Sequence, residues 1–189
     1  YPDATIAASA MALACIPQFV KLPEGTKTLT LKDGDTLSLG KHTLKFIAAP
    51  MVHWPEVLLS YDESEKILFS ADAFGTFGLS GKLGEDWVSE ARRYYINIVG
   101  KYGMQVQAVL KKAAALDIQT ICPLHGPVLK EDLEYYLKLY QTWSSYGVES
   151  EGVAVFYTSV YGNTEKAVRL LEEELAEKGC PKVAVTDNR

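Results

Sequence analysis

The sequence predicts an α/β protein in two consecutive parts, and three observations lead to this prediction. The first part opens with short segments of alternating hydrophobicity, typical of paired strands, and continues into longer segments with helical periodicity. A polar stretch over residues 146–152 then interrupts the pattern, as expected for a linker. After it, residues 153–189 follow the order strand, loop, helix, strand, which is one βαβ unit.

The first predicted element is a short helix over residues 10–19, for which Ser9 is a suitable N-cap. Short strands are expected next, because apolar and polar residues alternate there between turns. Asp33-Gly34 is typical of a two-residue hairpin turn, so the strands on either side of it are expected to pair. A second hairpin is expected across residues 62–65. The predicted strands cover residues 26–31, 36–39, 42–49, 56–61 and 66–71.

The pattern changes after residue 71. Residues 72–84 contain four of the fourteen glycines and almost no periodicity, which indicates a long loop of the kind that often carries function. The later elements return to regular periodicity. Helices are predicted over residues 85–99, 105–116 and 130–143, with a short strand over 119–122.

The second part begins with five apolar residues in a row, Val153–Tyr157, which predicts a strand buried on both faces. Residues 165–178 have an apolar and a charged face, as expected for an amphipathic helix. Gly179 is a suitable helix stop, and residues 181–185 begin a second strand.

Composition and charge exclude several classes of protein. With 48% hydrophobic and 23% charged residues, the chain has a globular composition, and no apolar run approaches the roughly 20 residues that span a bilayer. A formal net charge of −5 argues against a nucleic-acid partner and against an anionic membrane surface. The three cysteines form no C-x-x-C pair, so reduced thiols in a cytoplasmic protein fit best. Because Tyr1 is not an initiator Met, we expect the sequence to begin inside a longer product.

The loop between the Val153–Tyr157 strand and the following helix is a candidate phosphate site. It contains hydroxyl, amide and glycine residues at a helix N-terminus, where backbone N–H groups and the helix dipole favour an anion. The lysine of a nucleotide-triphosphate loop is missing, and so is G-x-G-x-x-G, so a single phosphate monoester is the expected ligand. An ordinary capped strand–helix turn is the alternative interpretation. The candidate residues are Ser159, Val160, Tyr161, Gly162, Asn163 and Thr164.

Two of the three histidines and one aspartate follow predicted strands. His53 lies after the strand that ends near Ala49, Asp72 directly follows the strand that ends at residue 71, and His125 follows the strand over 119–122. Strand ends at one sheet edge can converge in a single cleft. Imidazoles bind borderline metals such as zinc and iron, and a carboxylate can bridge two ions. Taken singly, each residue is compatible with a structural role. His42 lies within a predicted strand, where we assign it a structural role only.

Taken together, these motifs resemble those of the flavodiiron proteins. The segments are His-Trp-Pro at 53–55, Phe-Ser-Ala-Asp-Ala-Phe-Gly at 69–75, Pro-Leu-His-Gly-Pro at 123–127 and the loop at 159–164. In that family a metallo-β-lactamase-like αβ/βα sandwich is followed by a flavodoxin-like, doubly wound domain. The resemblance implies residues 1–145 as the C-terminal part of the lactamase-like domain, 146–152 as the linker, and 153–189 as the first βαβ unit of the flavodoxin-like domain.

The resemblance also implies a site and a reaction. His53 would ligate one iron, His125 the other, and Asp72 would bridge the two iron ions, while the loop at 159–164 would bind the phosphate of FMN. Electrons would pass from rubredoxin or a similar donor through FMN to a non-haem diiron centre that reduces dioxygen or nitric oxide. A head-to-tail homodimer is the expected assembly.

Two other functions stay open at this stage. The family's remaining ligands come from a His-x-Glu-x-Asp-His motif that this sequence does not contain, so a metal-dependent hydrolase of the same fold is an alternative. A non-catalytic fragment is another, in which metal and FMN are held weakly or not at all.

Overall fold

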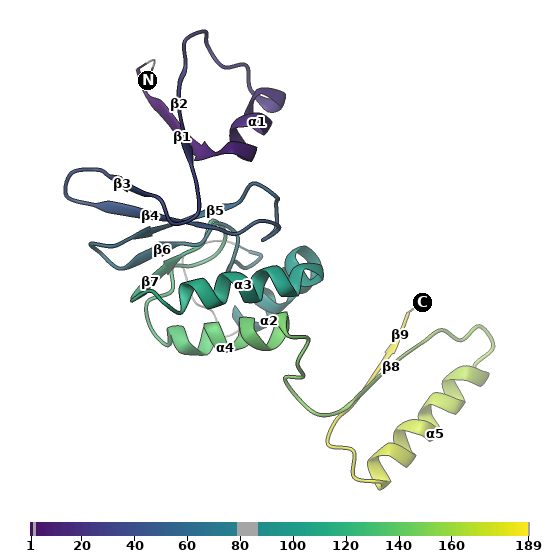
Figure 1. Cartoon of the computed structure of the whole chain (residues 1–189). Coiled ribbons are helices and arrows are strands. Elements are labelled where there is room, and N and C mark those ends of the chain that lie inside the picture. Colours follow the sequence, from purple (N-terminus) through teal and green to yellow (C-terminus); the bar gives the residue numbers. More distant parts are fainter. Residues whose placement is uncertain (2, 79–86, 189) are drawn as a thin grey trace. The chain divides into compact units, whose positions relative to one another are not determined.

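The computed structural model describes residues 1, 3–78 and 87–188 and divides the chain into two compact units, Tyr1–Gly147 and Val148–Arg189 (Figure 1). The boundary between the units falls within residues 146–152, where the sequence predicts a linker. Each unit is therefore described by itself.

In the described part of the first unit, a five-stranded sheet has the order β3-β4-β5-β6-β7. Strands β3 to β6 are antiparallel neighbours, and β7 is parallel to β6. The hairpin predicted across residues 62–65 is confirmed as β5 and β6. The strands are β3 (Thr36–Ser38), β4 (Thr43–Ala48), β5 (Leu58–Asp62), β6 (Ile67–Phe69) and β7 (Thr120–Cys122).

The strand directions decide where functional loops emerge. Because β4 and β6 are both antiparallel to β5, they run in the same direction, and β7 runs parallel to β6. The carboxyl ends of these three strands therefore lie at the same edge of the sheet. His53, Asp72 and His125 each follow one of these ends.

A smaller sheet precedes the main one. Strand β1 (Thr5–Ser9) pairs in parallel with β2 (Lys27–Leu31), and helix α1 (Ala10–Phe19) connects them. The predicted helix and cap are confirmed, because the Ser9 hydroxyl accepts a hydrogen bond of 3.1 Å from the amide of Ala12. Strand β1 was not predicted.

The hairpin predicted around Asp33-Gly34 is wrong, since β2 pairs with β1 and β3 pairs with β4. The turn residues themselves bond to β4 and the residues beside it. The Gly34 amide donates to the carbonyl of Phe46, and the Asp33 carboxylate accepts from the amide of Ala48 at 2.7 Å. These hydrogen bonds attach the turn to β4. The local sequence of the turn therefore does not determine how the flanking strands pair.

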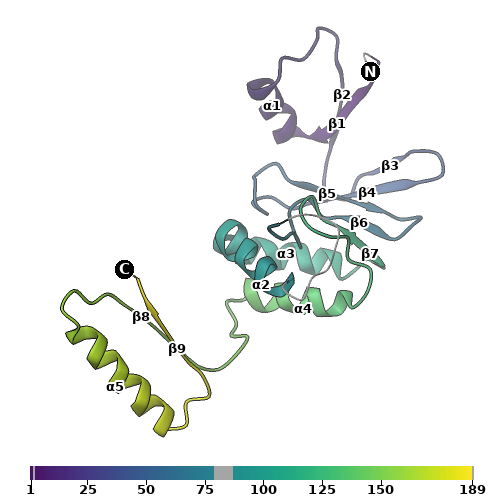
Figure 2. The ribbon, with the colours of Figure 1, turned by 180° about the vertical axis from the view of Figure 1, so that it is seen from behind.

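Three helices lie together on one side of the main sheet, as the two opposite views show (Figures 1 and 2). They are α2 (Trp87–Tyr94), α3 (Gly103–Ala113) and α4 (Leu133–Ser144). Their apolar faces and the covered face of the sheet form one core, which is rich in aromatic side chains. The core includes Leu59, Leu68, Ile121, Tyr95, Tyr140 and Trp143.

The helix predicted over residues 85–99 differs from the structure in its second half. Residues 79–86 lie outside the described residues, and α2 gives way to a π-helix over Tyr95–Val99 and a 3-10 turn over Gly100–Tyr102. Apolar periodicity does not distinguish these helix types, because their hydrogen-bond spacings differ by only one residue. The helix predicted over 130–143 begins at Leu133.

The second unit consists of β8 (Val153–Tyr157), helix α5 (Asn163–Glu177) and β9 (Val183–Asp187), with β8 and β9 parallel. The predicted βαβ order is confirmed, and Gly179 follows α5 at a φ of +80°. The prediction that β8 is buried on both faces is wrong, because Phe156 is 68% exposed and only Tyr157 of this strand is buried. Within the described residues, α5 covers one face of this two-stranded sheet.

Among the residues that the structure describes, none of the helices is long and apolar enough to cross a bilayer.

Candidate metal and phosphate sites

The three residues predicted from strand ends meet around one carboxylate. Nε2 of His53 lies 2.9 Å from one oxygen of Asp72, and Nε2 of His125 lies 3.3 Å from the other. The side chain of Asp72 is 14% exposed, that of His53 is 22% exposed and that of His125 is 59% exposed. The cluster therefore has a largely buried carboxylate and one side open to solvent.

Backbone hydrogen bonds join the loops that carry Asp72 and His125. The amide of Leu124 donates to the carbonyl of Ala71 at 2.7 Å, and the amide of Thr76 donates to the carbonyl of His125 at 3.3 Å. Since these bonds lie on either side of the two functional residues, the loops after β6 and β7 fix each other. The bond from Leu124 to Ala71 continues the parallel β6–β7 register beyond the strands.

Two glycines let these loops come close together. A Cβ atom on Gly75 would lie 2.9 Å from the carbonyl oxygen of Asp72, and one on Gly126 would collide with the hydroxyl of Thr76. Gly126 also has a φ of +92°, which side chains disfavour. The glycine after His125 is therefore required by space and by backbone conformation.

The donor set suits two metal ions that share a carboxylate. Each Asp72 oxygen faces a different imidazole nitrogen, so each oxygen and its histidine are available to one ion. Within the described ranges, no group of three or more His, Cys, Asp or Glu side chains is arranged to hold a metal ion. One histidine and one carboxylate oxygen for each ion is the arrangement that the family resemblance implies, and further ligands are needed to complete either ion.

Sequence reasoning missed Tyr94 at this site. Tyr94 lies at the end of α2, is buried, and has its ring 6.0 Å from that of His125. Burial, the charge of Asp72 and a hydrogen bond to the Asp72 side chain raise the pKa of Tyr94 to about 12. The phenol therefore stays protonated at neutral pH and donates to the carboxylate. No sequence motif points to this residue, because a tyrosine on the apolar face of a predicted amphipathic helix is expected to be a core residue.

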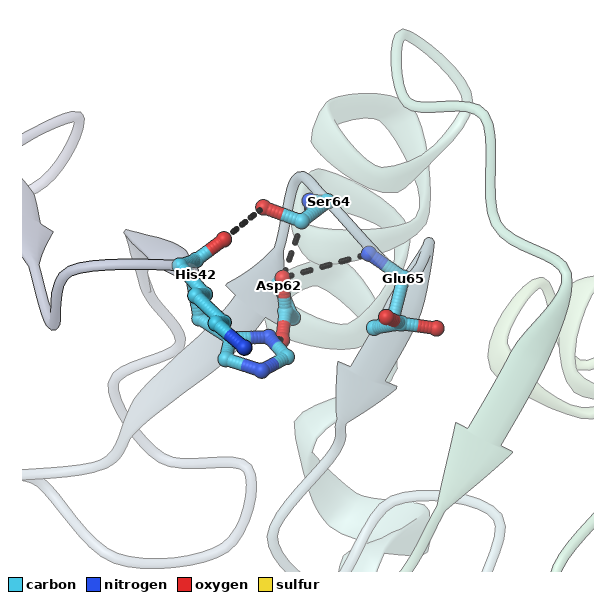
Figure 3. Close-up of polar contacts among 5 residues, drawn as sticks. His42, Asp62, Ser64 and Glu65 are labelled. Atoms are coloured by element: carbon cyan, nitrogen blue, oxygen red, sulfur yellow. Dashed lines mark hydrogen bonds and ion pairs between the residues drawn. The ribbon is translucent and has the colours of Figure 1, made fainter.

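His42 lies outside this cluster, as the sequence predicted. Its Nδ1 is 2.7 Å from one oxygen of Asp62, whose other oxygen accepts hydrogen bonds from the amides of Ser64 and Glu65 (Figure 3). The pair joins the start of β4 to the turn between β5 and β6. His42 is thus bound to a carboxylate of its own.

The candidate phosphate loop connects β8 to α5. Ser159 is 2% exposed, and among the described residues its hydroxyl oxygen has no hydrogen-bond partner. Gly162 precedes α5 with a φ of +80°, and the described side chains provide no cap for that helix. A buried, unpaired hydroxyl beside uncapped helix amides fits a bound anion. Val160 and Tyr161 are exposed.

Comparison with known proteins also finds a β-lactamase-like family. Residues 2–126 match the family model described as "ODP family beta lactamase". An uncharacterized protein of Methanocaldococcus jannaschii is 38% identical over 151 residues, which are 77% of this chain and 38% of that protein. A rubredoxin-oxygen oxidoreductase of Megalodesulfovibrio gigas is 31% identical, over 79% of this chain and 40% of that protein. The chain thus spans less than half the length of these curated relatives.

Solved structures extend the similarity to almost all of the chain. The flavodiiron protein of Giardia intestinalis has a TM-score of 0.88 and 27% identity, covering 98% of this chain and 46% of that one. The rubredoxin oxygen:oxidoreductase of Desulfovibrio gigas has a TM-score of 0.83 and 27% identity, covering 97% of this chain and 47% of that one.

Proposed function

Since this chain belongs to the flavodiiron proteins, within the ODP family of β-lactamase-like domains, we propose that it acts in an oxidoreductase that holds two iron ions and FMN. The observation that carries the proposal is the geometry at Asp72, whose two oxygens face His53 and His125 separately. The names of its relatives support the redox assignment: they include diflavin flavoproteins and a rubredoxin-oxygen oxidoreductase.

In this proposal, the ligands act through position and charge. His53 and His125 each offer an imidazole nitrogen, and Asp72 offers one oxygen beside each of them. Tyr94 keeps its proton on the phenolic oxygen and holds the carboxylate in place with a hydrogen bond. When bound, the two irons would supply the centre that reduces dioxygen or nitric oxide, and FMN would supply the electrons.

The loop of the second unit would hold the FMN phosphate. The Ser159 hydroxyl and the first amides of α5 are donors, and Gly162 lets the backbone approach closely. The exposed side chains of Val160 and Tyr161 are free to contact the rest of the flavin. The same loop favours the redox function over a metal-dependent hydrolase, which needs no flavin.

The electron donor and the assembly follow from the same proposal. A small carrier such as rubredoxin would reduce the FMN, and a head-to-tail homodimer would bring the FMN of one subunit to the irons of its partner. The three cysteines, Cys15, Cys122 and Cys180, are unpaired thiols, which suits a cytoplasmic location.

The ligand assignment is tested by iron content in the natural protein that contains this chain. His53→Ala and His125→Ala are each expected to lower the iron bound per subunit, measured by mass spectrometry, because each removes the imidazole of one ion. His42→Ala is the matched control and is expected to keep the wild-type iron content, since His42 pairs with Asp62 instead. Wild-type iron content in both ligand variants would overturn the assignment.

The reaction is tested separately. The protein loaded with iron and FMN is expected to consume dioxygen or nitric oxide when reduced rubredoxin is supplied. Absence of both activities in a fully loaded protein would overturn the redox proposal.

A further inference from the structure

A single turn of π-helix, Tyr95–Val99, begins at the residue that follows Tyr94. The Gly100 amide donates to the carbonyl of Tyr95, five residues back, where an α-helix spaces its hydrogen bonds by four. Such turns contain one extra residue, are rare, and occur frequently at functional sites. The π-turn therefore directly follows Tyr94, the residue that contacts the candidate metal ligands.

The turn separates two adjacent buried tyrosines that face different surroundings. The ring of Tyr94 lies 5.1 Å from that of Phe77 and 6.0 Å from that of His125, on the side of the metal ligands. The ring of Tyr95 lies 5.2 Å from that of Tyr140, inside the core. Both tyrosines are nearly inaccessible to solvent, so neither can change direction without repacking.

The extra residue sets the rotation between the helices on either side. Each residue of an α-helix turns the chain by about 100°. Helix α3 is fixed in the core through Val106 and Val109, and Val99 is fully buried just before it. If the π-turn became an α-turn while α3 kept its packing, α2 would have to rotate, and Tyr94 at its end would leave the cluster.

Asn97 supplies a hydrogen bond inside this turn. Its side-chain Nδ2 donates to the carbonyl of Arg93 at 2.7 Å. When the hydrogen-bond spacing changes from four to five residues, a backbone group of that turn loses its α-helical partner. An added side-chain donor offsets this loss. Asn97 is itself exposed and touches none of the three candidate ligands in the described contacts.

We propose that the π-turn Tyr95–Val99 holds Tyr94 against Asp72 and His125, and that Asn97 is the positioning residue that stabilises this turn. The effect of this turn on iron binding rests on the proposed function. The position of Tyr94 does not depend on it, because the contacts involve only side chains of this chain.

The test uses the metal-free chain, so that it is independent of iron chemistry. Asn97→Leu removes the donor and introduces a strong α-helix former. The NMR cross-peaks between the ring protons of Tyr94 and His125 are expected to be lost, and the Cα shifts of residues 95–99 are expected to move toward α-helical values.

Two further variants separate positioning from a general loss of structure. Asn97→Thr replaces the amide donor with a hydroxyl that can donate to the carbonyl four residues earlier, and is expected to keep the Tyr94–His125 cross-peaks. Thr142 makes such a bond to the carbonyl of Lys138 at 3.0 Å in regular helix α4, so Thr142→Val is the matched control and is expected to leave the cross-peaks unchanged.

The outcomes are distinct. Wild-type cross-peaks in a folded Asn97→Leu variant would overturn the inference. If Asn97→Leu does not fold, failure of Asn97→Thr to keep the cross-peaks of the wild type would overturn it as well. Neither result depends on whether the protein binds iron, and a wild-type protein that binds no iron would instead overturn the proposed function.

Discussion

The phenolic oxygen of Tyr140 accepts a hydrogen bond of 2.6 Å from the backbone amide of Phe74, 66 residues earlier in the chain. Tyr140 is completely buried in α4, and Phe74 lies two residues after Asp72. The bond therefore anchors the loop that carries the candidate bridging carboxylate to the helical layer. The two rings also contact each other, with their centroids 4.2 Å apart and their planes tilted by 32°.

Tyr140→Phe is expected to destabilise the first unit by about 1–3 kcal/mol, because it leaves the buried amide of Phe74 without its acceptor. Urea unfolding followed by tryptophan fluorescence measures this, since all three tryptophans lie in the first unit. Tyr135→Phe changes an exposed tyrosine of the same helix and is expected to have little effect. Equal stability of the two variants would contradict the anchoring role.

Gly126→Ala is expected to destabilise the same unit and to displace His125. The new methyl group would collide with the hydroxyl of Thr76, and a φ of +92° strains any side chain, at a cost of about 1–3 kcal/mol. Gly34→Ala is a suitable comparison, because Gly34 also has positive φ but has open space around it. A crystal structure and an unfolding curve of each variant measure the two effects, and an unmoved His125 would argue against the spatial constraint.

The sequence was most informative about the site where chemistry and topology coincide. His53, Asp72 and His125 follow three strands that run in one direction. Locating the strands showed that the three residues could meet, and the family resemblance turned that possibility into a predicted site. Tyr94 could not be predicted in this way. Its direction depends on the π-turn after it, which apolar periodicity does not reveal.

In the fold too, features determined by neighbouring residues were predicted, and features determined by distant residues were not. The cap at Ser9 and the turn between β5 and β6 depend on neighbouring residues, and both were predicted. The pairing of β2 depends on β1, and the Asp33 carboxylate bonds to β4, so the predicted hairpin was wrong there. Burial of β8 likewise depends on what packs against it.

Tyr94→Phe is expected to lower the iron affinity of the natural protein roughly 10- to 100-fold, as is usual when a group that orients a metal ligand is lost. Burial, and then the charge and hydrogen bond of Asp72, raise the pKa of the Tyr94 phenol to about 12, so the phenol keeps its proton well into alkaline pH. Iron titration under anaerobic conditions measures the affinity, with Tyr135→Phe as control. Unchanged affinity would show that Asp72 needs no hydrogen bond from Tyr94.

The His42–Asp62 pair predicts a pH dependence of stability. Burial acts to raise the pKa of Asp62, but hydrogen bonds from Ser64, Glu65 and His42 outweigh it, and the pKa lies below its ordinary value of 3.8. Because the folded pKa is lowered, the stabilisation is complete above 3.8 and is lost as the pH falls through the lowered pKa. The difference in unfolding free energy between wild type and Asp62→Asn should therefore shrink in acid, and a difference independent of pH would contradict this.

Ser159→Ala is expected to have opposite effects on stability and on binding. Among the described residues the Ser159 hydroxyl is buried without a partner, which costs about 1–3 kcal/mol, so its removal should stabilise the second unit without ligand. Slower hydrogen exchange of the β8 amides would report this, because the unit contains no tryptophan. FMN affinity should fall about tenfold or more, as one hydrogen bond to the phosphate is lost.

The control for this variant is Thr186→Ser, which alters an exposed hydroxyl residue of β9 in the same unit. It is expected to leave FMN affinity unchanged, because β9 does not contribute to the 159–164 loop. Titration with FMN and with inorganic phosphate, each followed by calorimetry, separates recognition of the phosphate from recognition of the flavin ring. Faster β8 exchange in Ser159→Ala, together with wild-type FMN affinity, would mean that the hydroxyl serves the fold and that the phosphate lies elsewhere.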